Sequence, residues 1–507
     1  MRTRALLAAL VTLLWAAPPA RAVVFVVTKT TDSNDGACDE DCSLREAILA
    51  ANQLQDATNR IDLAPGTYRL SIPRDSGRFG NALGSGADGN LVVTRTLTIA
   101  GAGRDTTILD ARPSPEAAGV DRVLGVSNTG NLTISGVTIT GGRTVEFGQG
   151  AGVLVLGGAL QISDCRVSDN VAASAGGGIA LGGAGANPPA SATITRCEIV
   201  ENVAGFGSPT GGQGGGLLNI QATMTVVEST IRDNTALLST GGGMMNIDTQ
   251  NRPSPAAELT VLRSTIVGNL AGDPDGQSPA EGVGGGIYNS GGLLRLTNST
   301  VTENEAVPSF LEGLGALPGT GRGGGVAHAL LLGDDETDGT FLVNATIAYN
   351  TGHTGSQLYA DEEVNPLVLA NTLIVGGAGA TPNCASPTSP IVELGFDSVG
   401  GGNVSDDASP CGLDQPTDQA NVPDPGLAAA LAENGGPTET IALLEGSPAI
   451  GAGFAPSCPA IDQRGLGRHT PCDAGAYEFD APEAGAGAGA IASVGALALL
   501  RRPGRRR

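Results

Sequence analysis

A repeated segment that ends in asparagine constrains the fold of this chain more than any other feature. Short β-branched runs recur along the middle of the chain, and the asparagines that end them are spaced 32, 32, 35, 35 and 46 residues apart. These asparagines are Asn170, Asn202, Asn234, Asn269, Asn304 and Asn350. Gly-Gly-Gly triplets recur in phase between them, the first at residues 176–178 and the last at 323–325. No single repeat can bury its own apolar face, but stacked repeats can.

The pattern inside each repeat predicts strands rather than helices. The runs alternate apolar and polar residues and are bounded by Gly, Asn, Asp and Ser. Nothing between them reads as a helix long enough to build βαβ units. One repeat per coil, with strands pairing to the coils above and below at about 4.8 Å per coil, satisfies both observations. We therefore predict an all-β right-handed parallel β-helix, because a β-sandwich does not explain why asparagine and the glycine triplets recur in phase.

Equivalent residues of stacked coils should form columns. One column should fill the core with Val167, Ile199, Ile231, Ile266, Val301 and Ile347. The asparagines should form a second, inward-facing column at a turn, because asparagine tolerates the left-handed backbone conformation and its amide can pair with stacked copies. That position makes them architecture rather than a functional site. Cys165 and Cys197 hold the same place in adjacent repeats, where Cα atoms about 5 Å apart could support a disulfide or leave two buried thiols.

The start of the mature chain predicts a cap on the solenoid. Residues 23–28 read as a strand, and an acidic loop follows. Ser43-Leu-Arg-Glu46 then matches a helix capping box. The residues Leu44, Ala47, Ile48 and Ala51 follow at helical spacing. A short amphipathic helix should therefore cover the open end of the first coil, since an uncapped solenoid exposes its sheet edges.

This N-terminal region resembles the CSLREA domain of bacterial secreted proteins. The resemblance is carried by Cys42-Ser-Leu-Arg-Glu-Ala-Ile48, preceded by Asp35-Gly-Ala-Cys38 and followed by Ala50-Ala-Asn52, and it spans about residues 25 to 70. The segment Leu97-Thr-Ile-Ala-Gly-Ala-Gly103, with Thr107-Ile-Leu-Asp110, resembles the opening coil of pectate-lyase-like β-helices.

The far end of the chain resembles the choice-of-anchor Q domain. The segments that carry this resemblance are Asn434-Gly-Gly-Pro-Thr438, Gly446-Ser-Pro-Ala449, Asp462-Gln-Arg-Gly465 and Cys472-Asp-Ala-Gly-Ala-Tyr-Glu478. The resemblance implies a surface-attached or secreted β-helix and no established reaction. Within Asp462-Gln-Arg-Gly465, we expect a buried Asp–Arg pair that closes the last coil rather than a catalytic group.

Both ends of the chain read as export signals. Arg2 and Arg4, an apolar run from Ala5 to Ala17 and Ala20-Arg21-Ala22 predict a cleaved signal peptide, because the run is shorter than the about 20 residues that span a membrane. At the other end, the uncharged stretch from Ala484 to Leu500 precedes an arginine cluster. This tail resembles the GlyGly-CTERM and PEP-CTERM sorting signals of bacteria, which implies that it lies transiently in the membrane.

The expected organisation follows from these features. It comprises a signal peptide at 1–22, an N-terminal cap with the first strands at 23–95, β-helix repeats at 96–378, C-terminal coils with a choice-of-anchor Q-like cap at 379–480, and a sorting tail at 481–507. We expect a bacterial protein that is secreted or held at the cell surface.

Charge and cysteine content agree with an exported protein. The formal net charge is −23, and outside the signal peptide and the terminal arginines 20 basic residues stand against 51 acidic ones. Such a surface repels nucleic acid, so nucleic acid is not an expected partner. Eight cysteines fit an oxidising compartment. From spacing alone, the disulfide candidates are Cys38, Cys42, Cys165, Cys197, Cys384, Cys411, Cys458 and Cys472.

Two acidic patterns are weak candidates for Ca²⁺, and both have plainer interpretations. The residue before each asparagine is acidic in Asp169, Glu201, Asp233 and Glu303, a column that Gly268 interrupts. Stacked like charges about 5 Å apart cost on the order of 1 kcal/mol, which a cation would relieve. A solvated acidic face with counterions is the simpler interpretation of this column. Asp32 and Asp35 lie in a loop that is one residue short of EF-hand spacing, and an Asx-rich turn is the simpler interpretation.

No motif for catalysis stands out in the sequence. The three histidines are far apart and no nucleophile elbow or phosphate loop is present. We therefore expect a non-enzymatic exported β-helix that acts in adhesion or contacts an envelope component or extracellular glycan. The alternative is a Ca²⁺-dependent polysaccharide lyase or hydrolase. Two long insertions, at 271–283 and 306–322, are further candidates for recognition, with flexible surface loops without a function as the equal alternative.

Overall fold

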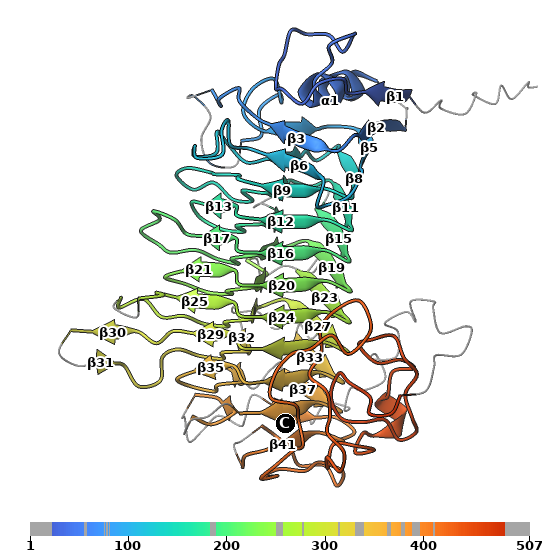
Figure 1. Ribbon diagram of the computed structural model, residues 1–507. Coiled ribbons are helices and arrows are strands. Elements are labelled where there is room, and N and C mark those ends of the chain that lie inside the picture. Colours follow the sequence, from blue (N-terminus) through green and yellow to red (C-terminus); the bar gives the residue numbers. More distant parts are fainter. Residues whose placement is uncertain are drawn as a thin grey trace, which may run out of the picture.

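The computed structural model shows a long right-handed solenoid with one capped end and a C-terminal segment packed against its side (Figure 1). It describes residues 23–481 apart from 55–57, 76, 78–79, 81, 183–188, 250–256, 276–277, 313–314, 330–338, 362–366, 377–380, 388–395 and 409–410. The expected signal peptide at 1–22 and almost all of the expected sorting tail, from 482 onward, lie outside the described residues.

Four parallel sheets run along the solenoid axis, because each strand pairs with its counterparts in the neighbouring coils. Sheet A contains β1 (Val23–Val26), β2 (Asn59–Leu63), β5 (Thr96–Gly101), β8 (Asn131–Ser135), β11 (Ala159–Ser163), β15 (Ser191–Thr195), β19 (Thr223–Val227), β23 (Glu258–Leu262), β27 (Leu293–Thr297), β33 (Gly339–Val343), β37 (Leu367–Ala370) and β40 (Phe396–Ser398). Sheet B contains β3 (Gly66–Arg69), β6 (Thr107–Asp110), β9 (Thr138–Thr140), β12 (Arg166–Ser168), β16 (Glu198–Val200), β20 (Thr230–Arg232), β24 (Thr265–Val267), β28 (Thr300–Thr302), β34 (Thr346–Ala348), β38 (Leu373–Val375) and β41 (Val404–Ser405).

The remaining strands complete each coil. Sheet C contains β4 (Leu91–Val93), β7 (Leu124–Val126), β10 (Val153–Val155), β14 (Ile179–Leu181), β18 (Leu217–Ile220), β22 (Met244–Ile247), β26 (Ile287–Ser290), β32 (Val326–Ala329), β36 (Leu358–Ala360) and β39 (Cys384–Ala385). The short sheet D contains β13 (Val171–Ala172), β17 (Val203–Ala204), β21 (Thr235–Leu237), β25 (Leu270–Gly272), β29 (Glu305–Ala306) and β35 (Thr351–Gly352). In the second long insertion, β30 (Phe310–Leu311) and β31 (Gly315–Ala316) pair antiparallel in a projecting hairpin (Figure 1).

The parallel register confirms the predicted fold class. Val167 pairs with Ile199, which pairs with Ile231, and the column continues through Ile266, Val301 and Ile347. All six side chains are buried in one continuous core. Each coil contributes one strand in turn to sheets A, B, D and C. Stacking of the coils therefore buries the apolar face that a single repeat cannot bury alone.

The six asparagines form a buried ladder along the turn that follows sheet B. The amide nitrogen of each donates to the amide oxygen of the next, with distances of 2.8–3.0 Å from Asn170 to Asn350. Gln357 continues the ladder beyond Asn350, and the backbone N–H of Gly142 donates to Asn170 at its other end.

The expectation that asparagine itself takes the left-handed conformation is wrong. The residue before each asparagine has the positive φ, with values of 54° at Asp169, 56° at Glu201 and 54° at Asp233. The preceding residue makes the bend, which leaves the asparagine side chain buried inside the coil. The acidic column therefore occupies the bend positions on the outside of the turn.

Two further buried ladders run parallel to the first. Asn219 donates to Asn246 and Asn246 to Asn289, at the turn from sheet C to sheet A, and Asn289 then donates to the hydroxyl of Thr340. At the turn from sheet A to sheet B, the hydroxyl of Ser229 accepts from the backbone of Cys197, and serines continue this column through Ser264 and Ser299. The two cysteines thus occupy the first positions of a serine column.

Cys165 and Cys197 are buried free thiols in the structure. Of the two possibilities that the sequence left open, a disulfide or two buried thiols, the structure has the second. Burial raises the pKa of the Cys197 thiol, which keeps it protonated. Because the other six cysteines form disulfides, we expect two thiols per chain to react with a thiol reagent in denaturant and none in the native protein. Mass spectrometry after alkylation measures both numbers. A fully denatured chain without reactive thiols would instead show a disulfide between the two coils.

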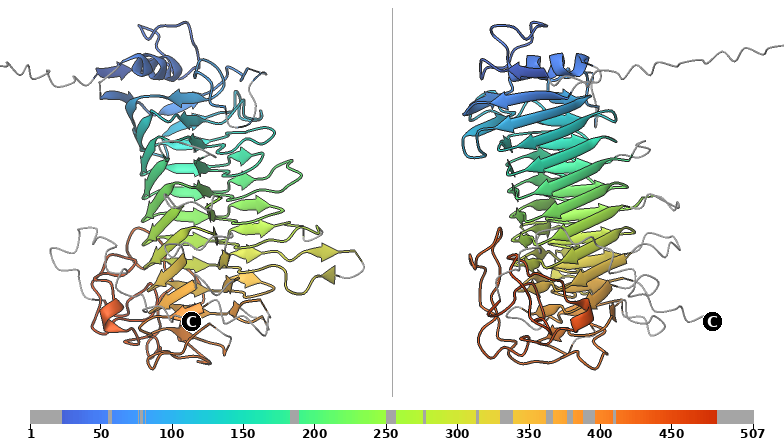
Figure 2. Two further views of the ribbon diagram at one scale, coloured as in Figure 1. Left: turned by 180° about the vertical axis from the view of Figure 1, so that it is seen from behind. Right: turned by 90° about the vertical axis from the view of Figure 1, so that its right-hand side faces the viewer.

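The N-terminal cap has the expected helix. α1 (Leu44–Gln53) begins at Ser43, whose side chain accepts from the N–H of Glu46 while Glu46 binds back to the Ser43 N–H at 2.7 Å. Leu44, Ala47, Ile48 and Ala51 are buried against the first coil. Figure 2 shows the helix lying across this end of the solenoid.

The C-terminal region does not simply close the last coil, and this corrects the expectation for the Asp462–Arg464 pair. The segment at 427–480, here called the returning segment, contains a 3₁₀ turn (Ala455–Ser457) and packs beside strands that lie several coils back. The pair forms, at 2.7 Å, but its neighbour Gln463 binds Thr300 of β28, three strands before β41 in sheet B. In Figures 1 and 2 the red end of the chain accordingly lies alongside the solenoid.

Threonines on the outer face of sheet B hold the returning segment. Thr265 donates to the carbonyl of Glu439 at 2.6 Å, Thr300 donates to Gln463 at 2.7 Å, and Thr346 accepts from the N–H of Ala476 at 2.9 Å. These three threonines share one column of the sheet. Nearer the last coil, Leu373 and Val375 pack against the returning segment in a second apolar core.

Candidate functional site

The tip of the returning segment leaves a groove of about 730 Å³ against the outer face of sheet B. One wall consists of Glu198 and Val200 of β16 with Thr230 and Arg232 of β20. The returning segment supplies the other wall through Glu433 and residues 435–439, and Arg104, which follows β5, also lines the groove. The strand register places Glu198 beside Thr230 and Val200 beside Arg232, so adjacent coils present their side chains to the same groove.

Ion pairs hold the charged side chains of the groove in place. Each carboxylate oxygen of Glu198 forms one ion pair, one with Arg104 at 2.8 Å and the other with Arg166 at 2.8 Å. Arg232 is paired across the groove with Glu439 of the returning segment. These side chains are roughly one-third exposed. They can therefore reach a ligand while their rotamers stay restrained.

Gln463 fixes the wall that the returning segment contributes. This side chain is fully buried and accepts from Thr300 while it donates to Thr265 at 2.9 Å and to Thr438 at 3.0 Å. Because Thr438 belongs to the groove wall and the other two partners belong to the solenoid, Gln463 ties the two walls together. The sequence places Gln463 in the motif Asp462-Gln-Arg-Gly465 but does not reveal this role, since Thr438 and Thr265 lie 25 and 198 positions away.

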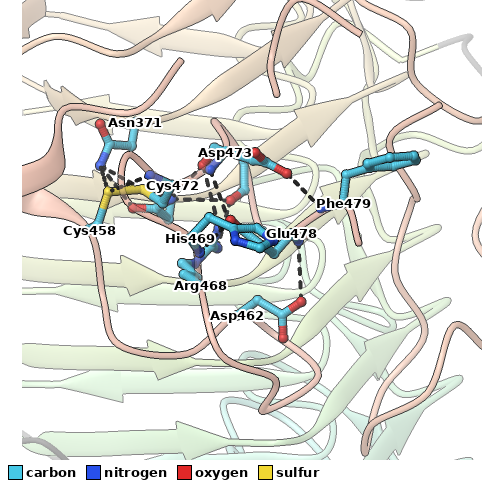
Figure 3. A network of polar contacts seen from close by, with 12 residues as sticks. Asn371, Cys458, Asp462, Arg468, His469, Cys472, Asp473, Glu478 and Phe479 are labelled. Atoms are coloured by element: carbon cyan, nitrogen blue, oxygen red, sulfur yellow. Dashed lines mark hydrogen bonds and ion pairs between the residues drawn. A yellow bond between two sulfur atoms is a disulfide. The ribbon is translucent and has the colours of Figure 1, made fainter. Parts of the chain in front are cut away.

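A buried ionic cluster supports the returning segment farther along. Arg468 donates to Glu478 at 2.8 Å and to Asn298 of the solenoid at 2.8 Å. Asp462 accepts from Arg464 and from the backbone N–H of Glu478. Figure 3 shows Arg468, Glu478, Asp473 and Asp462 gathered beside the Cys458–Cys472 disulfide.

The environment of this cluster marks it as a structural element. Burial raises the pKa of Asp473 and lowers the pKa of Arg468, while Glu478 opposes the change at Arg468. Arg468 and Glu478 are almost inaccessible to solvent, with side-chain exposures of 1% and 0%. The cluster therefore offers no surface to a substrate. Its two arginines are paired with Asp462 and Glu478, and Asp473 accepts from backbone N–H groups.

The structure disperses the Ca²⁺ candidates. Asp32 binds the buried guanidinium of Arg45 through both oxygens, at 2.7 and 2.9 Å, and Asp35 accepts from Ala37 in an Asx turn. Within the described ranges, no three His, Cys, Asp or Glu side chains are grouped so that they could hold a metal ion. Asp169, Glu201 and Asp233 lie exposed at their bends, and burial by neighbouring atoms raises the pKa of Asp233.

Two exposed phenylalanines lie on loops beside sheet D, apart from the residues that line the groove. Phe147 is 70% exposed and Phe206 is 50% exposed. The guanidinium of Arg143 lies over the ring of Phe206, 4.5 Å from its centroid. These two side chains are the largest among the exposed apolar side chains of the described residues.

The fold and the family comparison define the chain as a right-handed parallel β-helix protein. The family model described as "Right handed beta helix region" matches residues 122–326. No curated protein sequence matches the chain. Among the described residues no helix is long and apolar enough to cross a membrane.

Several solved structures resemble the chain at low identity. Pectate lyase Pel9A has 16% identity and a TM-score of 0.47, and the match covers 91% of this chain and 97% of that one. The A-module of the mannuronan C-5 epimerase AlgE4 of Azotobacter vinelandii has 14% identity and a TM-score of 0.38, covering 74% and 91%. A pectin methylesterase from carrot has 12% identity and a TM-score of 0.33, covering 76% and 89%.

Proposed function

We propose that the chain is an exported, surface-attached or released solenoid that binds an extracellular glycan in this groove without cutting it. The observation that supports this proposal is the groove itself. Sheet B supplies one wall, and the returning segment, held in place through Gln463, supplies the other. Glu198, Thr230 and Arg232 are preorganised on regular strands, which lowers the ordering cost of binding. The three disulfides are compatible with an extracellular location.

The direct test combines binding with depolymerisation. The purified mature chain is titrated by calorimetry with a panel of soluble neutral, anionic and cationic polysaccharides, and the same mixtures with and without Ca²⁺ are examined for shortened chains. We expect saturable binding and unchanged polymer length. Ca²⁺-dependent cleavage would instead establish the lyase or hydrolase alternative, and no binding across the panel would refute the proposal.

Removing a groove side chain should weaken binding without unfolding the protein. Arg232→Gln removes one charged hydrogen-bond donor from the groove, which is worth about 1.5–3 kcal/mol, so we expect affinity to fall roughly tenfold to a hundredfold. Isothermal titration calorimetry measures this change.

The matched control for Arg232→Gln is Arg295→Gln. Arg295 on sheet A is also partly exposed and paired with a carboxylate, that of Glu258 at 2.6 Å, but it lies outside the groove. It should leave the affinity unchanged. Equal losses from both variants would show that binding does not use the groove.

A further inference from the structure

The charge balance of the groove carries an inference about the class of glycan. Two arginines line the groove, Arg104 and Arg232, and both are paired with groove carboxylates. Glu433 also lines the groove and has no ion pair with any described residue. No guanidinium of the groove is therefore left over for a carboxylate of the ligand.

When the residues that pair with the groove are included, acidic side chains still outnumber basic ones. Arg166 shares Glu198 with Arg104 and also reaches Asp105 at 3.4 Å. The groove and its direct partners thus contain Arg104, Arg166 and Arg232 against Asp105, Glu198, Glu433 and Glu439. The whole chain has a net charge of −23, so the long-range field also disfavours a polyanion.

We infer that the groove takes an uncharged, hydroxyl-rich polysaccharide rather than a polyuronate, an inference that rests on the proposed function. A paired carboxylate and guanidinium presents an acceptor and a donor side by side, which matches the donor and acceptor character of neighbouring sugar hydroxyls. Thr230 adds a hydroxyl to the sheet-B wall of the groove. A ligand carboxylate would have to displace Glu198 or Glu439 from its arginine.

An excess of one exposed carboxylate does not make a cation site. Glu433 lies on the exposed tip, where its interactions are screened by solvent and salt. A polycation would still collect on this acidic protein at low salt, without using the groove. Salt dependence therefore separates recognition by the groove from attraction to the surface as a whole.

The experiment compares three polymer classes at two salt concentrations. Neutral glucan, xylan, galactan and mannan, then polygalacturonate, then chitosan oligomers are titrated into the mature chain at about 10 mM and about 1 M NaCl, where the screening length is roughly 30 Å and 3 Å. We expect at least one neutral polymer to bind with an affinity that changes less than about threefold with salt. Polygalacturonate should not bind, and chitosan should bind only at low salt. Arg232→Gln and the control Arg295→Gln assign the neutral binding to the groove.

Each other result has a defined meaning. Polygalacturonate that binds and loses affinity in Arg232→Gln would overturn the inference about ligand class and leave the groove as the binding site. Chitosan binding that survives high salt and depends on Arg232 would do the same. If no polymer binds, or if binding is insensitive to Arg232, the proposed function itself fails.

Discussion

Arg468→Met is expected to release the returning segment from the side of the solenoid. The substitution leaves Glu478 buried without its cation and removes the bond to Asn298 that joins the segment to the solenoid. Breaking a buried ion pair from one side costs about 3–5 kcal/mol. Hydrogen exchange read by mass spectrometry should show residues 427–480 losing protection while the coils of the solenoid keep theirs, and limited proteolysis should cut within the segment.

The matched control for Arg468→Met is Arg196→Met. Arg196 also makes a bidentate pair, with Asp164 at 2.7 and 2.9 Å, but both side chains are about half exposed. This variant should cost less than about 1 kcal/mol, as exposed pairs do. A doubly substituted Arg468→Met, Glu478→Leu chain should recover part of the lost protection, because it no longer buries an unpaired charge. Wild-type protection in Arg468→Met alone would contradict a structural role for the cluster.

Release of the segment also has a functional consequence. Glu433 and residues 435–439 form one wall of the groove and are held through Gln463. Arg468→Met should therefore abolish glycan binding although Arg468 does not line the groove. This result would show that the ionic cluster supports glycan binding by holding the groove wall in place, without contacting the glycan.

Asn234→Leu should destabilise the solenoid in the middle of the asparagine ladder. Asn234 accepts from the backbone N–H and the amide of Asn202, and its own amide donates to Ile199 and to Asn269. Each buried polar group left without a partner costs about 1–3 kcal/mol, so we expect a loss of roughly 2–6 kcal/mol. Guanidinium unfolding followed by circular dichroism measures the shift of the transition.

Asp233→Asn is the control in the same coil. Asp233 is exposed at the bend with a φ of 54°, a conformation that asparagine also tolerates. The free energy of unfolding should change by less than about 0.5 kcal/mol. If both variants lost the same stability, the ladder would matter no more than the exposed bend beside it.

The ladder and its bend show where prediction from the sequence succeeded and where it failed. Six asparagines in phase with apolar residues identify a stacked inner column, because a solenoid places each residue against its own copies. The sequence pattern does not reveal which of two adjacent residues makes the bend. Acidic residues at positive φ, such as Asp169 and Glu201, occupy it instead of asparagine.

The second asparagine ladder escaped notice for a related reason. Asn219, Asn246 and Asn289 are spaced 27 and 43 residues apart, because the loops between them differ in length. Their strands still pair in register, but the loops hide the repeat in the linear sequence. His328 follows Asn289 in this column, and its ring nitrogen lies 3.1 Å from the hydroxyl of Thr340.

The candidate site was beyond sequence reasoning because its walls come from distant parts of the chain. Arg232 and Glu439 are separated by 207 positions. The outward threonines of sheet B, such as Thr265 and Thr300, are the one local signal that something covers this face. Alone, those threonines are also ordinary residues of an exposed strand.

The sequence by itself determined the repeated part of this protein, including the coil, its core column, the inner asparagines and the N-terminal helix with its capping box. These features depend on contacts between a residue and its near neighbours or its copies in adjacent coils. The tertiary structure alone decided the path of the returning segment and therefore the groove. That path depends on single contacts between unlike residues, such as Gln463 with Thr300 and Arg468 with Asn298, and no periodicity encodes them.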